Sequence, residues 1–278
     1  MCIRDSYSVY CKSVDGSYSK LDAELVRNYG DYGRADVIGV KAGTYQFKIV
    51  PVDEEGTEMT GQAVESSTFE VKAHDRAGFA HFNYSGVGAY KDDGTLKDNA
   101  KVLYVTSKTA KTVTCSVVTD SKDKVETFTG LQTIIDARQK GYDTTPLVIR
   151  IIGLIEANDM DHFSSSAEGL QIKGKNANSE MNITLEGVGN DATIRGFGIL
   201  LRNCKSVEIR NFAVMLCMDD CISLDTDNSN CWVHNIDFFY GKTGSASDQA
   251  KGDGSLDCKA DSKSVSYTHL TLPTKLEV

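Results

Sequence analysis

The sequence MDDCISLDTDNSNCWVHNIDFFYGKTGSASDQAKGDGSLDCK (residues 218–259) decides the fold of the chain around it. Two segments within it, CISLD (221–225) and SLDCK (255–259), align at an offset of 34 residues. In this alignment Ile222 matches Leu256, and apolar and polar residues alternate in both copies. Such alternation is typical of short β-strands. We therefore predict two similar strands, one lying over the other.

A second repeat lies earlier in the chain. NITLEGV (182–188), SVEIRNF (206–212) and NCWVHNI (230–236) align at a spacing of 24 residues. Their matching apolar residues form two columns, Ile183 with Val207 and Cys231, and Leu185 with Ile209 and Val233. A fixed period with one short strand per copy is the pattern of a solenoid, in which each coil buries its apolar residues against its neighbours. Because GILL (198–201) precedes the second copy as CISL (221–224) precedes the third, each coil has at least two strands. The sequence predicts an all-β fold, a right-handed parallel β-helix.

Acidic residues stand at the starts of the two matched strands, Asp219 with Asp220 at the first and Asp253 with Asp257 at the second. Adjacent strands lie roughly 4.8 Å apart, so these carboxylates would repel one another without a cation among them. The matched positions carry no His or Cys, and oxygen ligands favour Ca²⁺, which tolerates irregular, hydrated sites better than Mg²⁺. We expect a calcium site at Asp220, Asp253 and Asp257.

Other polar residues in this region are better explained by backbone structure. Asp225 and Asp227 are expected in a polar turn. Asn211 and Asn235 lie 24 residues apart and are expected to point inward and to bond the backbone at a tight turn. His234 is expected to alternate outward, either solvated or stacked on a neighbouring ring.

The offset between copies rises from 24 to 34 residues in the last coil, and the ten extra residues fall in GKTGSASDQAKGDG (241–254). An insertion of this length on one face of a repeat is usually where the binding surface lies. Lys259 directly follows the strand that carries Asp257, and either faces this surface as a substrate-binding residue or is solvated.

The runs DDCISLDTDNSNCWVHNIDFF (219–239) and KGDGSLDCKADSKSV (251–265) resemble the core of the pectate lyase family. The family pattern reads D-A-I-S-I-D, then N-V-W-V-D-H, then D-G-x-L-D-I-K. The resemblance extends over roughly residues 86–264, and it implies calcium ligands at the three aspartates proposed above. Many members carry a further Asp where this chain has Met218, with Asp219 adjacent.

The resemblance implies calcium-dependent, β-eliminative cleavage of polygalacturonate, the backbone of pectin. Calcium that bridges protein carboxylates and the uronate carboxylate acidifies the proton at C5. The family's base is an Arg supported by a Lys, on coils beyond the last one visible here. We therefore assign no catalytic residue, and expect this chain to be a fragment without lyase activity.

Two other functions fit parts of the pattern. A polygalacturonase-type hydrolase shares the β-helix and uses paired aspartates as acid and base. Of the characteristic sites of such hydrolases, this chain carries only the pair Asp219-Asp220. A non-catalytic β-helix could bind cell-wall glycan or act as an adhesin. Because the base-bearing coils are expected elsewhere, this chain itself could belong to the non-catalytic class while it still binds calcium.

The first part of the chain predicts a different structure. Residues 7–73 show short alternating segments separated by Gly-containing turns, which indicates an antiparallel β-sandwich with Tyr45, Phe47 and Ile49 on its inner face. GTYQFKIVPVDEEG (43–56) resembles a strand and hairpin of a fibronectin type III module, so we expect a partial module of that type.

We predict the following division of the chain: a linker at residues 74–86, the β-helix at 87–265, and artefactual sequence at 1–6 and 266–278, which fits neither pattern. Within the β-helix region, TGLQTIIDARQKG (129–141) predicts an amphipathic helix with Thr129 as N-cap and Gly141 as C-cap. An open β-helix end must be covered, and we expect this helix to cover it.

Composition narrows the class of protein. A net charge of −9 and a pI near 5.1 argue against nucleic-acid binding, and no apolar run is long enough to span a membrane. The eight cysteines form no C-x-x-C pair, and most are expected in the core, Cys231 and Cys258 in apolar columns. From the resemblance we expect a secreted, monomeric protein whose partner is pectin.

Overall fold

The computed structural model describes residues 6–163, 169–217, 219–239 and 254–271. The chain divides into two compact units, Met1–Asp75 with Asp93–Leu96, and Arg76–Asp92 with Lys97–Val278. The linker expected at residues 74–86 is therefore wrong from Arg76 onward. That segment packs within the second unit, where Arg76 forms a buried ion pair with Glu208.

The first unit is an antiparallel β-structure, as predicted. Its main sheet has β1 (Ser6–Ser13) at the centre, between β2 (Ser19–Lys20) and β5 (Gly43–Val52), and β5 also pairs with β6 (Val64–Glu65) and β7 (Phe69–Val71). A separate pair, β3 (Val26–Asn28) and β4 (Gly33–Ala35), and two 3₁₀ turns, η1 (Ala23–Leu25) and η2 (Thr60–Gln62), complete it. The predicted inner face is wrong at Ile49, which is exposed, whereas Val50 is buried. The buried face changes along β5 where its neighbour changes from β7 to β6.

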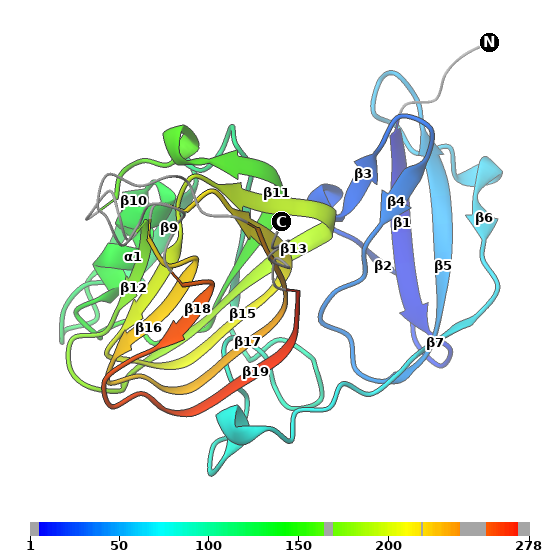
Figure 1. Ribbon diagram of the computed structural model, residues 1–278. Coiled ribbons are helices and arrows are strands. Elements are labelled where there is room, and N and C mark those ends of the chain that lie inside the picture. The colour runs from blue at the N-terminus through cyan, green and yellow to red at the C-terminus, as the bar shows by residue number, and fades with distance from the viewer. Residues whose placement is uncertain (1–5, 164–168, 218, 240–253, 272–278) are drawn as a thin grey trace, which may run out of the picture. The chain divides into compact units, whose positions relative to one another are not determined.

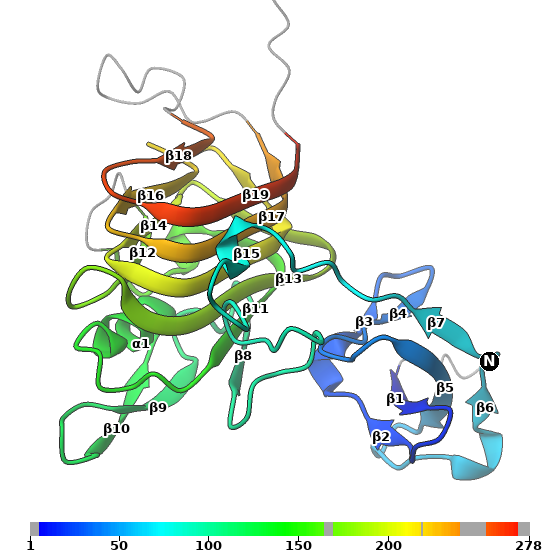
Figure 2. The same cartoon turned by 90° about the horizontal axis from the view of Figure 1, so that it is seen from below.

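The second unit is a parallel β-helix (Figures 1 and 2). One sheet runs in the order β19 (Lys263–Thr271), β17 (Ser229–Phe238), β15 (Cys204–Met215), β13 (Ser179–Arg195), β11 (Leu147–Glu156) and β8 (Lys101–Val105). The other runs β12 (Leu170–Lys173), β14 (Ile199–Arg202), β16 (Ile222–Thr226) and β18 (Leu256–Cys258). All neighbours in both sheets are parallel.

The predicted registers are confirmed in both sheets. Val207 lies between Ile183 and Cys231, and the same spacing aligns the second apolar column. In the other sheet Ile222 lies between Ile199 and Leu256. These apolar side chains are fully or almost fully buried in one continuous core, apart from the half-buried Leu256. Burial of this continuous apolar interior is the main force that holds the coils together.

The turns of successive coils share a left-handed backbone. Positive φ angles recur at Asn211 (66°), Asn235 (52°) and His269 (52°), at one turn of three successive coils. Asn is favoured in this conformation, which explains its recurrence. This left-handed bend lies inside β15 and β17 rather than in a separate turn, and the predicted inward orientation is wrong: Asn211 and Asn235 are exposed. The Nδ2 of Asn211 donates to the Gly187 carbonyl across one coil (2.8 Å).

The last described coil extends further than predicted. β19 pairs with β17 from Lys263 to Thr271, and His269 takes the left-handed turn position of the preceding coils. Excluding residues 266–278 from the fold is therefore wrong for residues 266–271. The ladder continues because Tyr267 lies over Val233 and Leu270 over Ile236, which keeps the alternation of the strand.

Six of the described cysteines are buried, as predicted for most of them, but Cys258 is exposed. Its strand is the last one described in its sheet, so no further described strand lies against it. No described helix is long and apolar enough to cross a membrane.

Helix α1 (Leu131–Arg138) lies at the opposite end of the stack from β18 and β19 (Figure 2), beside the hairpin of β9 (Thr114–Val118) and β10 (Val125–Thr129). Its Leu131, Ile134 and Ile135 enter the core, which confirms the predicted apolar face. Gln132 completes the cover, because its side-chain amide bonds both the N–H and the carbonyl of Gln171 in β12, each at 2.9 Å. The side chain thus replaces a neighbouring strand at the edge of the sheet.

The predicted N-cap of this helix is wrong. The helix starts after Gly130, not Thr129, and no side chain at the N-cap position bonds it. The free N–H groups of Gln132 and Thr133 donate instead to the carboxylate of Asp161, each at 2.9 Å. Asp161 comes from the segment after the 3₁₀ turn η4 (Ala157–Asp159), so the cap is supplied by a distant part of the chain.

Replacing Asp161 by alanine is expected to lower the free energy of unfolding by ~1–2 kcal/mol, because two helix N–H groups lose their acceptor. Urea unfolding monitored by the fluorescence of the single tryptophan, Trp232, measures this. Asp98→Ala is the control, since Asp98 is exposed and pairs only across the surface with Lys91. Equal midpoints for the two variants would show that Asp161 does not cap the helix.

Candidate functional site

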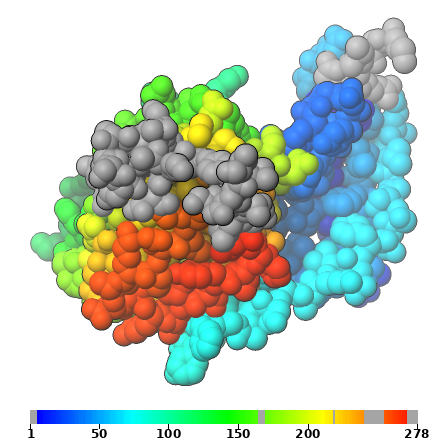
Figure 3. Space-filling model, viewed as in Figure 1, coloured from blue at the N-terminus to red at the C-terminus, as the bar shows by residue number. Residues whose placement is uncertain are grey.

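The predicted acidic residues meet where β16 and β18 lie side by side. Asp220 lies two residues before the start of β16, and Asp257 of β18 is the direct neighbour of Ser223. A hollow of about 40 Å³ opens there, lined by Ile199, Leu200, Asp219, Asp220, Ser223, Asp225 and Lys259. Figure 3 looks onto this end of the β-helix, where the residues of β18 and β19 form the orange and red surface. We call this group of residues the acidic hollow.

Asp220 is the most enclosed carboxylate of the acidic hollow, only 5% exposed. Its Oδ1 accepts the N–H of Gly254 (2.9 Å), and its Oδ2 accepts a hydrogen bond from Lys259 Nζ (2.7 Å). A Cβ on Gly254 would lie 2.3 Å from the Oδ1 of Asp257 and 2.8 Å from that of Asp220. A side chain at position 254 would therefore displace the carboxylates of Asp220 and Asp257 from their present positions.

Lys259 is shared between the two carboxylates. Its Nζ lies 2.7 Å from Asp220 Oδ2 and 3.7 Å from Asp257 Oδ2. The hydrogen bond to Asp220 raises the pKa of the lysine, so the ammonium stays charged. The predicted alternatives for Lys259 were a groove-facing or a solvated side chain, and the structure places it in the acidic hollow with 44% of its side chain exposed.

Asp225 lies in β16, not in the turn that we predicted for it. Its Oδ2 accepts hydrogen bonds from Arg202 Nε (2.6 Å) and Thr226 Oγ1 (2.9 Å). Partial burial raises the pKa of Asp225, but these two donors lower it by more, so the group is a carboxylate in the acidic hollow. Asp227 is at a turn with a left-handed backbone (φ 51°), as predicted.

The donor atoms of the acidic hollow fit a hard cation. The buried Oγ of Ser223 has no hydrogen-bond partner within the described part of the chain, although it lines the hollow among carboxylates. A cation with oxygen ligands would satisfy that oxygen, and carboxylate and hydroxyl oxygens are ligands that Ca²⁺ accepts. Asp253 and Met218 lie outside the described residues. Within the described residues, no group of three His, Cys, Asp or Glu side chains is close enough to hold a metal ion.

Replacing Lys259 by methionine is expected to strengthen calcium binding by roughly 2- to 5-fold. In the wild type, calcium must displace the ammonium from Asp220 and Asp257, and the substitution removes this competitor. Calorimetric titration at low ionic strength measures the affinity. Lys263→Met, which removes an exposed lysine from β19, is the matched control. Weaker binding by the Lys259 variant would mean that the ammonium supports the site.

A second polar cluster covers the outer face of the large sheet, and the sequence did not reveal it. Glu208 of β15 is fully buried, and its Oε1 contacts Arg76, Arg210 and the Nε2 of His234, at 3.3, 3.2 and 3.1 Å. Glu186 of the adjacent β13 joins it through Arg210 (2.6 Å), and Arg150 (2.9 Å) and Tyr90 (2.6 Å) also contact Glu186. We call these seven side chains the buried charge network.

His234 lies on the outer face of its strand, as predicted, but it is not solvated. The side chain is 3% exposed and stacks on Trp232, with ring centroids 3.8 Å apart. The reason is the segment Arg76–Asp92, which lies over this face: Ala80 and Val87 pack on Trp232, and the Nδ2 of Asn230 donates to the Ala80 carbonyl (2.9 Å). The stacking alternative was correct, and the solvated one was not. This cluster is a structural element rather than an open site.

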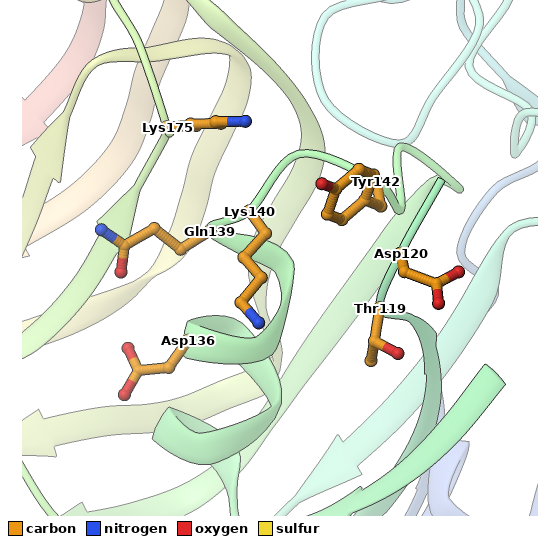
Figure 4. A pocket seen from close by; sticks show the side chains of 7 residues that line it. All are labelled: Thr119, Asp120, Asp136, Gln139, Lys140, Tyr142 and Lys175. Atoms are coloured by element: carbon orange, nitrogen blue, oxygen red, sulfur yellow. The ribbon is translucent and has the colours of Figure 1, made fainter. Parts of the chain in front are cut away.

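A wider hollow of about 680 Å³ lies beside α1, away from the acidic residues (Figure 4). The figure shows Lys140 and Tyr142 between Asp136 on the helix and Asp120 on the hairpin side. Lys175 Nζ lies 5.8 Å from the centre of the Tyr142 ring. His162 lies at the edge of this region, with one ring nitrogen 3.0 Å from Asp136 and the other 3.1 Å from Asp161.

No family model and no curated protein matches the chain. Several solved structures are similar to the chain. A pectate lyase from Bacillus sp. N165 in complex with trigalacturonate is similar over 70% of this chain and 55% of its own, with a TM-score of 0.48 and 19% identity. A polygalacturonate lyase fused with a self-assembling amphipathic peptide is similar over 74% and 63%, with a TM-score of 0.39 and 13% identity. The chain thus spans 55–63% of the lengths of these two proteins. We base the proposed function on the residues of the site.

Proposed function

We propose that this chain carries the calcium-binding part of a pectate lyase that acts on polygalacturonate outside the cell. The observation that carries the proposal is the sharing of one cation, the Lys259 ammonium, by the carboxylates of Asp220 and Asp257 on adjacent strands. Such an arrangement favours replacement of the ammonium by a divalent cation, because two carboxylates can compensate two positive charges.

The residues that would hold calcium are Asp220, Asp257 and the hydroxyl of Ser223, with Asp219 and Asp225 at the rim and Asp253 proposed from the sequence. Bound calcium supplies charge neutralisation for a uronate carboxylate and makes the C5 proton more acidic. Lys259, once separated from its two carboxylates, is placed to pair with a substrate carboxylate. The prediction that the catalytic Arg lies outside this chain, and that the chain alone lacks lyase activity, stays a prediction.

The hydrolase alternative is less well supported. A hydrolase of that type needs one carboxyl group that keeps a proton to donate to the leaving group. Both oxygens of Asp220 accept hydrogen bonds, from an N–H and from an ammonium, so neither is placed to donate a proton to a leaving group. A glycan-binding β-helix without catalysis differs from the lyase in the test below.

The test is calorimetric titration of calcium into the purified chain, with and without oligogalacturonate, beside Asp253→Asn/Asp257→Asn. Binding by the wild type and loss of binding in the double variant are expected. Asp237→Asn/Asp261→Asn is the matched control, since both side chains are exposed and outside the acidic hollow.

Three results lead to different conclusions. Absence of calcium binding in a folded wild-type chain would overturn the proposal. Oligogalacturonate binding that is unchanged by calcium would support the glycan-binding alternative. Formation of an unsaturated product that absorbs in the near ultraviolet would support the lyase and contradict the predicted inactivity.

A further inference from the structure

Two buried cysteines lie next to each other beside the acidic hollow. Cys217 is fully buried and Cys221 is 3% exposed, and their Sγ atoms are 3.1 Å apart. A disulfide has an S–S length of about 2.05 Å, so an approach of about 1 Å closes the bond. The buried thiols of Cys204 and Cys231 donate to backbone carbonyls. Cys217 makes a longer contact of this kind with the Phe197 carbonyl (3.7 Å), so its nearest polar neighbour is the sulfur of Cys221.

We propose that Cys217 and Cys221 form a disulfide that closes the chain around Asp219 and Asp220. Both sulfur atoms belong to the apolar core, where a disulfide is accommodated as readily as two thiols. The bond itself does not depend on the proposed function. Its effect on calcium does, because Asp219 and Asp220 lie between the two cysteines in the sequence.

The bond forms by exchange with a small disulfide such as oxidised glutathione. The thiolate of one cysteine attacks that disulfide, forms a mixed disulfide and releases one glutathione. The thiolate of the second cysteine then attacks the protein sulfur and releases the second glutathione. The two protons of the protein thiols end on the two released glutathiones, and the two electrons reduce the small disulfide.

The timing of this reaction follows from burial. No oxidant reaches two side chains that are at most 3% exposed. The disulfide therefore forms during folding, before the coil closes, and is structural rather than reversible.

The experiment is mass spectrometry of the full chain refolded in a glutathione redox buffer. Free thiols are blocked with N-ethylmaleimide in denaturant, and the chain is cut with trypsin. The tryptic peptide of residues 211–242 carries Cys217, Cys221 and Cys231, so Cys231 serves as an internal control for labelling. We expect one label on this peptide, at Cys231, and three labels after reduction.

Three labels without reduction would overturn the proposal. A label pattern that places Cys231 in a disulfide would overturn it as well. The variant Cys217→Ser tests the partner: Cys221 should then accept a label, whereas Cys115→Ser should leave the peptide with one label.

Calcium titration of the oxidised and the reduced chain gives the second measurement. We expect a several-fold weaker affinity after reduction, because the segment that carries Asp219 and Asp220 loses a constraint. A disulfide without any calcium binding would keep this inference and reject the proposed function. Calcium binding without a disulfide would keep the proposed function and reject this inference.

Discussion

Replacing Glu208 by alanine is expected to lower the free energy of unfolding of the β-helix by ~3–5 kcal/mol. The substitution leaves three side chains, Arg76, Arg210 and His234, without the carboxylate that they share. Arg76 is the most affected, because its Nε and one terminal nitrogen already lack hydrogen-bond partners among the described residues. An uncompensated buried charge is costly, and the covering segment Arg76–Asp92 would lose its ion pair with β15.

Urea unfolding followed by Trp232 fluorescence measures this effect in the β-helix directly, because Trp232 stacks on His234 of the buried charge network. Glu126→Ala is the matched control. Glu126 pairs with Lys124 across the surface, where their side chains are 43% and 63% exposed, and its loss is expected to change stability by less than about 0.5 kcal/mol. If both variants unfold at the same urea concentration, the buried charge network does not stabilise the fold.

The pH dependence of stability, compared between the wild type and Glu208→Ala, gives an independent check. Burial raises the pKa of Glu208, but Arg210, His234 and Arg76 together lower it to about 2, from an ordinary value of 4.5. A carboxyl group whose pKa falls on folding contributes its full stability above the unfolded value and loses it as the pH falls through the folded value. The stability difference between wild type and Glu208→Ala should therefore shrink between pH 4.5 and pH 2. A constant difference over this range would contradict the assigned cause.

The apolar columns could be predicted from the sequence because one period controls them. Val207 lies beside Ile183 and Cys231, as the 24-residue spacing requires. The burial of the outer face could not be predicted in the same way. Alternation places His234 on the polar side of its strand, but it does not show that a segment more than a hundred residues earlier covers that side.

The position of Asp225 shows a second limit of the repeat. The pairing of β14 with β16 shifts between Leu201 and Arg202, so Arg202 lies beside Thr226 and reaches Asp225. A local irregularity of this kind leaves no mark on the hydrophobic pattern. The cap at Asp161 could not be predicted for a different reason. The sequence signals of a helix start describe local residues, whereas this carboxylate comes from a segment 29 residues later in the chain.

The acidic hollow combines a predictable and an unpredictable part. The stacking of the strands that carry Asp220 and Asp257 follows from the 34-residue offset. The ion pair of Lys259 with Asp220 joins residues 39 positions apart, and it decides the charge of the site without calcium. The site has two cations, Lys259 and Arg202, and four carboxylates, those of Asp219, Asp220, Asp225 and Asp257. It therefore carries two net negative charges, and one bound calcium ion would neutralise them, which removes the repulsion of an anionic substrate.

Replacing Asp220 by asparagine is expected to weaken calcium binding on the order of 100-fold, because the most enclosed carboxylate of the acidic hollow loses its charge. Asparagine keeps the shape of the side chain and its acceptor for the N–H of Gly254. The ion pair with Lys259 is lost, but an exposed lysine contributes only about 0.2–1 kcal/mol to such a pair. Calcium at 100 times its dissociation constant should stabilise the wild type by about 2.7 kcal/mol and the variant hardly at all. Asp237→Asn should behave as the wild type, and equal stabilisation of all three proteins by calcium would place the metal elsewhere.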